Sequence, residues 1–194
     1  KIENLFKYQN FFFFNIENLS TEDYFFDNRL FYVSRCRYTH SCLTRISKII
    51  NLTIARTQNV SKKVLVVDCD NTLWGGVIGE DGIDGIIIGN ETPLAESFTS
   101  FQMYINELRA RGITLAVCSK NDLVNAKEGF KHPESVLKFS DFAVFKANWI
   151  DKNFNNLDIV KELNIGIDSV VFIDDNPAER ELVSTQLIKI AVPN

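Results

Sequence analysis

Short apolar runs alternate with segments of helical periodicity from Lys62 to the end of the chain. The apolar runs are nearly continuous, which is typical of strands buried on both faces of a parallel sheet. Strands are expected at residues 63–69, 113–118, 142–145 and 169–173, and a fifth at residues 188–191. The alternation of strands with helices predicts an α/β domain with a parallel sheet.

Capping residues mark the helices between these strands. Thr92 and Pro93 give a cap followed by proline at the first helical position, and this helix is expected to stop at Gly112. Residues 176–179 supply a cap, a proline and a capping-box acid in order. Further helices are expected at residues 121–130 and 152–163.

Two shorter apolar pieces, Val77–Ile78 and Ile86–Ile88, flank a glycine-bearing stretch and predict a small β-hairpin flap. Residues 1–60 are rich in Phe and Asn and differ from the rest. Their clearest pattern is an apolar stripe at helical spacing between Cys42 and Ile54, which favours an amphipathic helix packed on a neighbour over one lying on a membrane surface.

The chain is therefore divided into two parts. Residues 1–60 are interpreted as the tail of an upstream domain or a linker from it, and residues 61–194 as the catalytic domain. The first part carries eight Lys and Arg against five Asp and Glu, whereas the second carries 13 against 20. An acidic second part argues against nucleic-acid binding, which needs a basic face.

No apolar stretch approaches the ~20 residues that span a bilayer, so no membrane association is expected. The four cysteines lack the paired spacing of a zinc site. They are interpreted as reduced thiols of a cytoplasmic protein.

Polar groups follow three of the expected strands. Asp68 and Asp70 end the first, Ser119 to Asn121 the second, and Asp174 with Asp175 the fourth. Parallel sheets bind ligands beyond the carboxyl ends of their strands, so these groups are expected to meet. Neighbouring carboxylates repel one another unless a cation or a proton lies between them, which favours a Mg²⁺ site that handles phosphate. The alternative is a capped strand end with solvated acids.

Four motifs in order resemble the haloacid dehalogenase (HAD) superfamily of phosphotransferases, over about residues 62–192. They are DxDxT at Asp68, Asp70 and Thr72, the strand-terminal Ser119, the lysine Lys152, and the acids Asp174 and Asp175. The stretches WGGVIGEDG, CSKND, HPE and FIDDNPAER are similar to the FkbH-like branch, subfamily IIIC. The resemblance implies a Rossmann-like, doubly wound parallel sheet with a small flap and no large cap domain.

The resemblance also implies roles for these residues. Asp68 is expected to attack phosphorus, Asp70 to act as acid and then base, Ser119 to bind a phosphoryl oxygen, and Lys152 to neutralise charge. Lys120 competes with Lys152 for the last role. Mg²⁺ is expected on Asp68, Asp174 and the backbone carbonyl of Asp70. Asp175 either binds the metal through water, orients Asp174, or only caps a helix.

The candidates for contact with substrate are Thr72, Trp74, Gly75, Gly76, Lys120 and Asn121. For Thr72 a role in supporting the turn is favoured, and Trp74 either floors a pocket or merely packs. Cys69 is a candidate acyl carrier, and the same role is considered for Cys118. Both are also small apolar strand residues, and alternation along the strand points Cys69 away from the face used by Asp68.

The function implied is that of a Mg²⁺-dependent phosphatase and glyceryl transferase with an aspartate nucleophile. It would dephosphorylate a phosphorylated three-carbon acid of the 1,3-bisphosphoglycerate type and load the glyceryl unit onto an acyl carrier protein. The alternative is a stand-alone hydrolase of small-molecule phosphates in polysaccharide or secondary metabolism. A non-catalytic interaction module is disfavoured by the full set of acids.

Overall fold

The structure, a computed structural model, describes residues 26–57 and 62–193. The chain forms two compact units, Lys1–Ser61 and Lys62–Asn194. In the first unit, α1 (Asn28–Ser34) begins after the cap Asp27, and α2 (His40–Thr57) covers the expected amphipathic helix. Whether this unit is the tail of an upstream domain stays a prediction. None of the helices that the structure describes is both long and apolar enough to cross a membrane.

The second unit is built on a four-stranded sheet in the order β3-β2-β1-β4 with every pair parallel. Its strands are β1 (Val64–Val67), β2 (Thr114–Ser119), β3 (Phe142–Ala147) and β4 (Val170–Ile173). The first strand in the chain lies inside the sheet between β2 and β4, so the chain winds outward in both directions from it. The predicted doubly wound α/β fold is confirmed.

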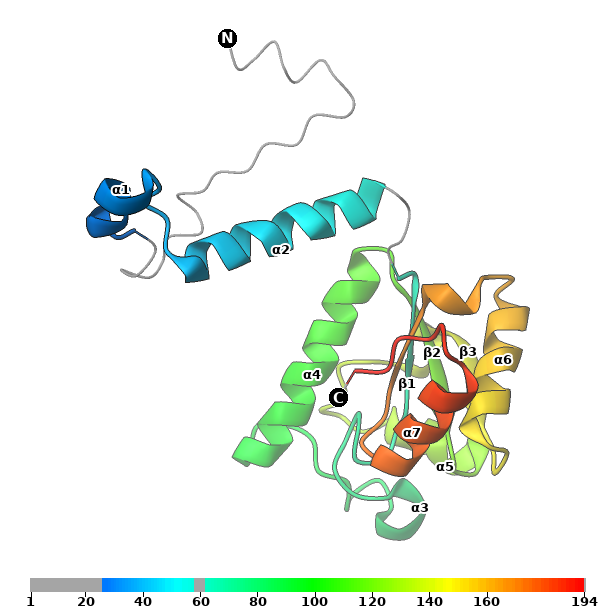
Figure 1. Cartoon of the computed structure of the whole chain (residues 1–194). Coiled ribbons are helices and arrows are strands. Elements are labelled where there is room, and N and C mark those ends of the chain that lie inside the picture. Colours follow the sequence, from blue (N-terminus) through cyan, green and yellow to red (C-terminus); the bar gives the residue numbers. More distant parts are fainter. Residues whose placement is uncertain (1–25, 58–61, 194) are drawn as a thin grey trace. The chain divides into compact units, whose positions relative to one another are not determined.

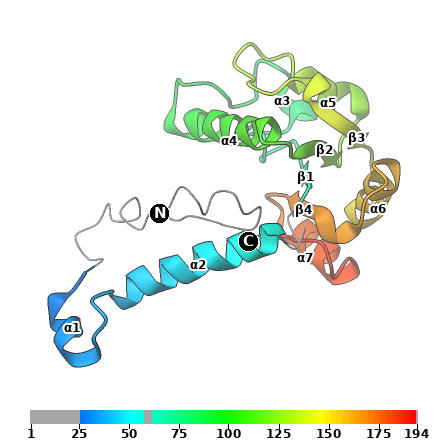
Figure 2. The same cartoon turned by 90° about the horizontal axis from the view of Figure 1, so that it is seen from above.

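Helices cover both faces of this sheet. On one face α4 (Pro93–Ala110) packs Ile105 against alternate residues of β1, and on the other α6 (Lys152–Glu162) and α7 (Pro177–Gln186) supply Ile159 and Val183. Figures 1 and 2 show α4 on the opposite side of the strands from α6 and α7. Because every residue of β1 is buried, the strand reads in the sequence as one continuous apolar run.

At α4 the predicted capping residues begin and end the helix. The Thr92 hydroxyl accepts a hydrogen bond from the backbone N–H of Ala95, Pro93 occupies the first turn, and Gly112 follows the helix with a positive φ of 94°. The helix α5 (Leu123–Gly129) follows Asp122, also as expected. At α7 the Asn176 side chain accepts from Ala178 N. The expected capping box does not form, because the backbone N–H of Asn176 donates to Asp174 Oδ1 and Glu179 pairs with Lys120.

Two expected β elements are reduced in the structure. The hairpin shrinks to one antiparallel bridge between Gly75 and Ile87, because Ile78 begins a helical turn, α3 (Ile78–Asp81). The fifth strand shrinks to one parallel bridge between Val171 and Ala191 at the edge of β4. The flap is thus a short helical loop that is joined to the following segment by a single bridge.

Candidate active site

The carboxyl ends of β1, β2 and β4 bring the predicted motifs together. The register pairs Val67 with Ile173, so Asp68 and Asp174 follow at the same level of adjacent strands. The backbone N–H of Asp68 donates to Ile173 O over 3.0 Å and fixes this alignment. Ser119 ends β2 on the other side of β1 and is almost completely buried.

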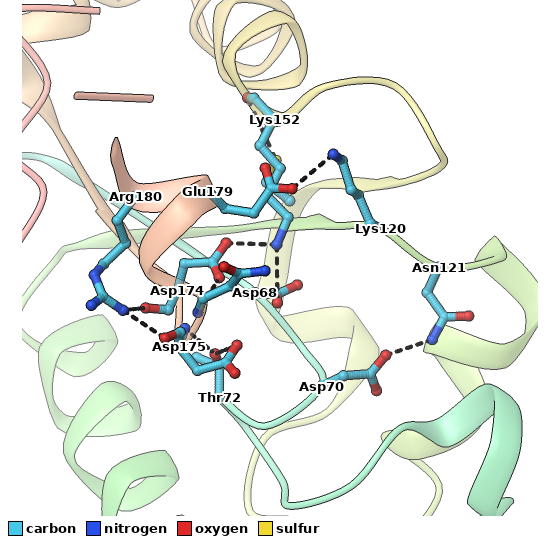
Figure 3. A network of polar contacts seen from close by, with 12 residues as sticks. Asp68, Asp70, Thr72, Lys120, Asn121, Lys152, Asp174, Asp175, Glu179 and Arg180 are labelled. Atoms are coloured by element: carbon cyan, nitrogen blue, oxygen red, sulfur yellow. Dashed lines mark hydrogen bonds and ion pairs between the residues drawn. The ribbon is translucent and has the colours of Figure 1, made fainter. Parts of the chain in front are cut away.

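Lys152, the first residue of α6, joins the two acids (Figure 3). Its Nζ lies 3.0 Å from Asp68 Oδ2 and 2.6 Å from Asp174 Oδ2, and all three side chains are buried. Burial lowers the pKa of the Lys152 ammonium, but the charges of Asp68 and Asp174 outweigh burial and leave the pKa raised. Lys152 is therefore a fixed positive charge between two carboxylates.

Burial raises the pKa of Asp68 to about 6, against the lowering effect of Lys152, and the negative charge of Asp174 raises it further. A hydrogen bond from the Ser119 hydroxyl lowers the same pKa. The second oxygen, Asp68 Oδ1, is buried and accepts no hydrogen bond. A buried carboxylate oxygen without a partner is costly, so this atom is suited to a ligand such as a cation.

Asp68, Asp174 and Asp175 each place a carboxylate oxygen within 4.8 Å of the others. The loop that carries the last two acids is held in place, because Asn176 N donates to Asp174 Oδ1 and Arg180 Nη1 donates to the carbonyl oxygens of both acids. Three hard oxygen donors beside an orphaned oxygen form a set that Mg²⁺ favours. These residues could therefore hold a divalent cation.

Asp70 lies outside that group of three acids. Its Oδ1 accepts from Trp74 Nε1 and from Ile78 N, both at 3.0 Å, and its Oδ2 accepts from Asn121 Nδ2 at 2.7 Å. These three donors, two from the loop after β1 and one from just beyond β2, fix the orientation of this carboxylate. The expected role of its backbone carbonyl at a metal stays a prediction.

The residues expected to contact substrate differ in their burial and in their partners. Trp74 is completely buried, and its ring meets Phe130 edge-on at 5.1 Å, so it packs rather than flooring a pocket. Thr72 Oγ1 accepts from Asp175 N at 3.1 Å, which ties the turn after β1 to the acids of β4. Lys120 forms ion pairs with Glu179 at 2.7 Å and Asp151 at 3.4 Å and is directed away from Asp68 (Figure 3).

The two glycines shape the loop after β1. Gly75 exchanges backbone hydrogen bonds with Ile87, and a Cβ there would lie 2.8 Å from the Phe98 ring. Gly76 has a φ of 91° and donates its N–H to Asn71 Oδ1. Both positions are thus explained by backbone geometry.

The two strand cysteines are core side chains in the structure. Cys69 is fully buried with the residues that face α4, on the opposite face from Asp68, as alternation predicts. Burial raises its pKa well above the ordinary value, and burial raises that of Cys118 as well. A buried protonated thiol is a poor nucleophile, so these observations do not support an acyl-carrier role.

Sequence reasoning missed two residues of the site. Arg180 braces the backbone after β4, and Glu179 anchors Lys120. Both lie in the first turn of α7, where a charged residue is ordinary, so the local pattern carries no signal for these contacts.

This chain is similar to a solved protein over its whole length. The N-terminal part of the protein BF1531 from Bacteroides fragilis, which contains a phosphatase domain and was crystallised in complex with Mg, is 41% identical, with a TM-score of 0.88. The match covers 100% of this chain and 52% of that one, so this chain spans about half of its length.

Two further solved structures are similar at lower sequence identity. A HAD-family enzyme from Bacteroides thetaiotaomicron, in complex with magnesium and inorganic phosphate, is 16% identical, with a TM-score of 0.46 over 69% of this chain and 94% of its own. The cobalt-bound deoxy-D-mannose-octulosonate 8-phosphate phosphatase from Haemophilus influenzae is 17% identical, with a TM-score of 0.45 over 63% and 64%. No protein-family model and no curated protein matches the chain.

The α/β Rossmann-like fold of this chain thus matches that of a protein that contains a phosphatase domain. These similarities do not single out the FkbH-like branch, which stays a prediction.

Proposed function

We propose that this chain is a Mg²⁺-dependent phosphatase of the HAD type with Asp68 as the nucleophile. The observation that carries the proposal is the buried group at the strand ends, in which Lys152 joins Asp68 to Asp174 while Asp68 Oδ1 has no partner. The similarity to a phosphatase domain that binds Mg, at 41% identity, supports it.

Asp68, Asp174 and Asp175 would hold the cation, and Asp70 through its backbone carbonyl. Bound Mg²⁺ supplies positive charge that offsets the repulsion between a phosphate and the acids. The donor set fits, because each of the three residues offers a carboxylate oxygen and Asp68 has a buried oxygen without a hydrogen-bond partner.

The residues then divide the reaction in two. Asp68 attacks phosphorus, the bond from phosphorus to the leaving oxygen breaks, and Asp70 gives that oxygen a proton. Asp70 next removes a proton from water, which attacks the aspartyl phosphate, releases phosphate and restores Asp68. Lys152 neutralises charge on the phosphoryl group, and the Ser119 hydroxyl donates to one of its oxygens.

The test is release of phosphate from a panel of alkyl, sugar and acyl phosphates with Mg²⁺ or with EDTA. Asp68→Asn is expected to lower turnover about 10⁴-fold, because it removes the nucleophile. Asp158→Asn, an exposed carboxylate on α6, is the matched control and should retain activity. An Asp68→Asn variant that is as active as the control would contradict the proposal.

The finer proposal is that the substrate is a phosphorylated three-carbon acid, whose glyceryl unit passes to an acyl carrier protein. The motif resemblance to the FkbH-like branch supports it. Incubation with Mg²⁺, 1,3-bisphosphoglycerate and a carrier protein, followed by intact mass of both proteins, is the measurement. A glyceryl adduct on the enzyme that survives Cys69→Ala excludes Cys69, and free phosphate without an acylated carrier favours the stand-alone phosphatase.

A further inference from the structure

The carboxylate of Asp70 is held from two directions. On one side, Oδ1 receives the indole N–H of Trp74 and the backbone N–H of Ile78, the first residue of α3. On the other, Oδ2 receives the side-chain amide of Asn121, just beyond β2. Both donors to Oδ1 come from the loop after β1, whereas the donor to Oδ2 comes from the loop after the neighbouring strand, β2 (Figure 3 shows the latter contact).

Each of these groups can only donate in its present position. An indole N–H and a backbone N–H have no acceptor capacity. The amide of Asn121 is also oriented, because its Oδ1 accepts from Asp122 N at 2.7 Å and its NH₂ group therefore faces Asp70. The donors on Oδ1 occupy two directions of that oxygen, whereas Oδ2 has one donor and a free direction.

Trp74 and Asn121 are themselves held in place. Trp74 is fully buried against Phe130, and a Cβ on Gly129 would lie 2.6 Å from its ring, so the indole has no room to turn. Asn121 is also almost completely buried. Neither side chain is exposed enough to contact a substrate over a large area.

We propose that Trp74 and Asn121 are positioning residues that orient Asp70 for proton exchange through Oδ2. This inference rests on the proposed phosphatase function. The occupied Oδ1 leaves Oδ2 as the atom that carries the proton. In the first half-reaction the O–H bond on Oδ2 breaks and the proton moves to the leaving oxygen as its bond to phosphorus breaks. In the second half-reaction Oδ2 takes a proton from water as the water oxygen bonds to phosphorus.

The test uses two leaving groups that differ in their need for a proton. An alkyl alcohol such as that of glycerol phosphate must be protonated as it leaves, whereas nitrophenolate leaves without a proton. Trp74→Phe and Asn121→Ala are expected to lower kcat for glycerol phosphate about 10-fold or more, with KM little changed. The first-turnover release of nitrophenol from 4-nitrophenyl phosphate should change by less than about threefold.

Trp149→Phe is the matched control. Its indole N–H also donates to a carboxylate, Asp122 Oδ1 at 3.1 Å, but the side chain is 70% exposed and does not contact Asp70. This variant should hydrolyse both substrates as fast as the wild-type protein. If Trp74→Phe does not fold, Asn121→Ala decides the question, because its truncation leaves the indole packing in place.

The outcomes separate the two proposals. If the wild-type protein is active and the variants hydrolyse both substrates more slowly by the same factor, or neither more slowly, the positioning role is wrong. The phosphatase function then stands. Wild-type protein without Mg²⁺-dependent phosphatase activity on either substrate overturns the proposed function and this inference with it.

Discussion

Two lysines close to the same strand ends differ in their surroundings. Lys152 is buried between Asp68 and Asp174, whereas Lys120 is 31% exposed and pairs with Glu179 and Asp151. A buried charge depends on its partners far more than an exposed one, because water cannot replace them. The two lysines therefore differ in what their removal should do.

Lys152→Met should lower the free energy of unfolding of the Mg²⁺-free protein by about 3 kcal/mol, because it leaves two buried carboxylates without a cation. Lys120→Met should cost less than about 1 kcal/mol. Urea denaturation of both variants with EDTA is the measurement. Saturating Mg²⁺ should recover part of the loss in Lys152→Met, since the cation compensates the same acids. Equal losses in the two variants would show that the charge pair is not what matters.

Among the helices, α4 is tied to the site by one buried side chain. Gln102 Nε2 donates to Leu73 O at 2.8 Å, within the loop after β1. Its Oε1 accepts from Val136 N and Leu137 N at 3.0 Å each and from the Ser135 hydroxyl at 3.2 Å. One amide thereby satisfies backbone groups of two loops that have no strand to pair with.

Gln102→Ala should lower the free energy of unfolding by about 3 kcal/mol or more, because each buried backbone group left unpaired costs about 1 to 3 kcal/mol. Met103→Ala, next to it on the helix but 53% exposed, should cost less than about 1 kcal/mol. Thermal and urea denaturation compare the two. A small effect of Gln102→Ala, similar to that of Met103→Ala, would mean that water enters and replaces the amide.

The sequence predicts the strands and the capped helices well, because burial on both faces of a strand and local side-chain caps leave marks within a few residues. The continuous apolar run at Val64–Val67 and the Thr92 cap are examples. The prediction fails at the flap and at the fifth strand, each of which is reduced to a single bridge. Ile78 turns into α3 because its backbone N–H is used by Asp70, and that partner is not evident from the apolar spacing.

In the candidate site, too, some features could be predicted from the sequence and others depend on distant contacts. The parallel topology was enough to expect Asp68, Ser119 and Asp174 at one edge, and choosing Lys152 over Lys120 needed the family resemblance. The burial and hydrogen bonds of Trp74 and Gln102 depend on contacts with residues far away in the sequence. A tryptophan beside a glycine pair predicts packing and pocket equally well, and a glutamine in a helix carries no sign of being buried.

At the scale of the whole molecule, the acid cluster links stability to pH and to metal. Because burial raises the pKa of Asp68 to about 6 against an unfolded value near 3.9, the folded protein without metal holds this proton more tightly than the unfolded chain. The group therefore favours folding at low pH, and that contribution is lost as the pH rises through about 6. Mg²⁺ should stabilise the protein most where Asp68 is ionised.

The free energy of unfolding in EDTA should fall by about 1 kcal/mol between pH 5 and pH 7.5 relative to that of Asp68→Asn, which lacks the titrating group. The difference between the two proteins removes the contribution of the other carboxylates. The rise in Tm on adding Mg²⁺ to the native sequence should be larger at pH 7.5 than at pH 5, since protons no longer compete with the cation for Asp68. A Mg²⁺ effect of the same size at both pH values would mean that the cation does not bind at the carboxylate of Asp68.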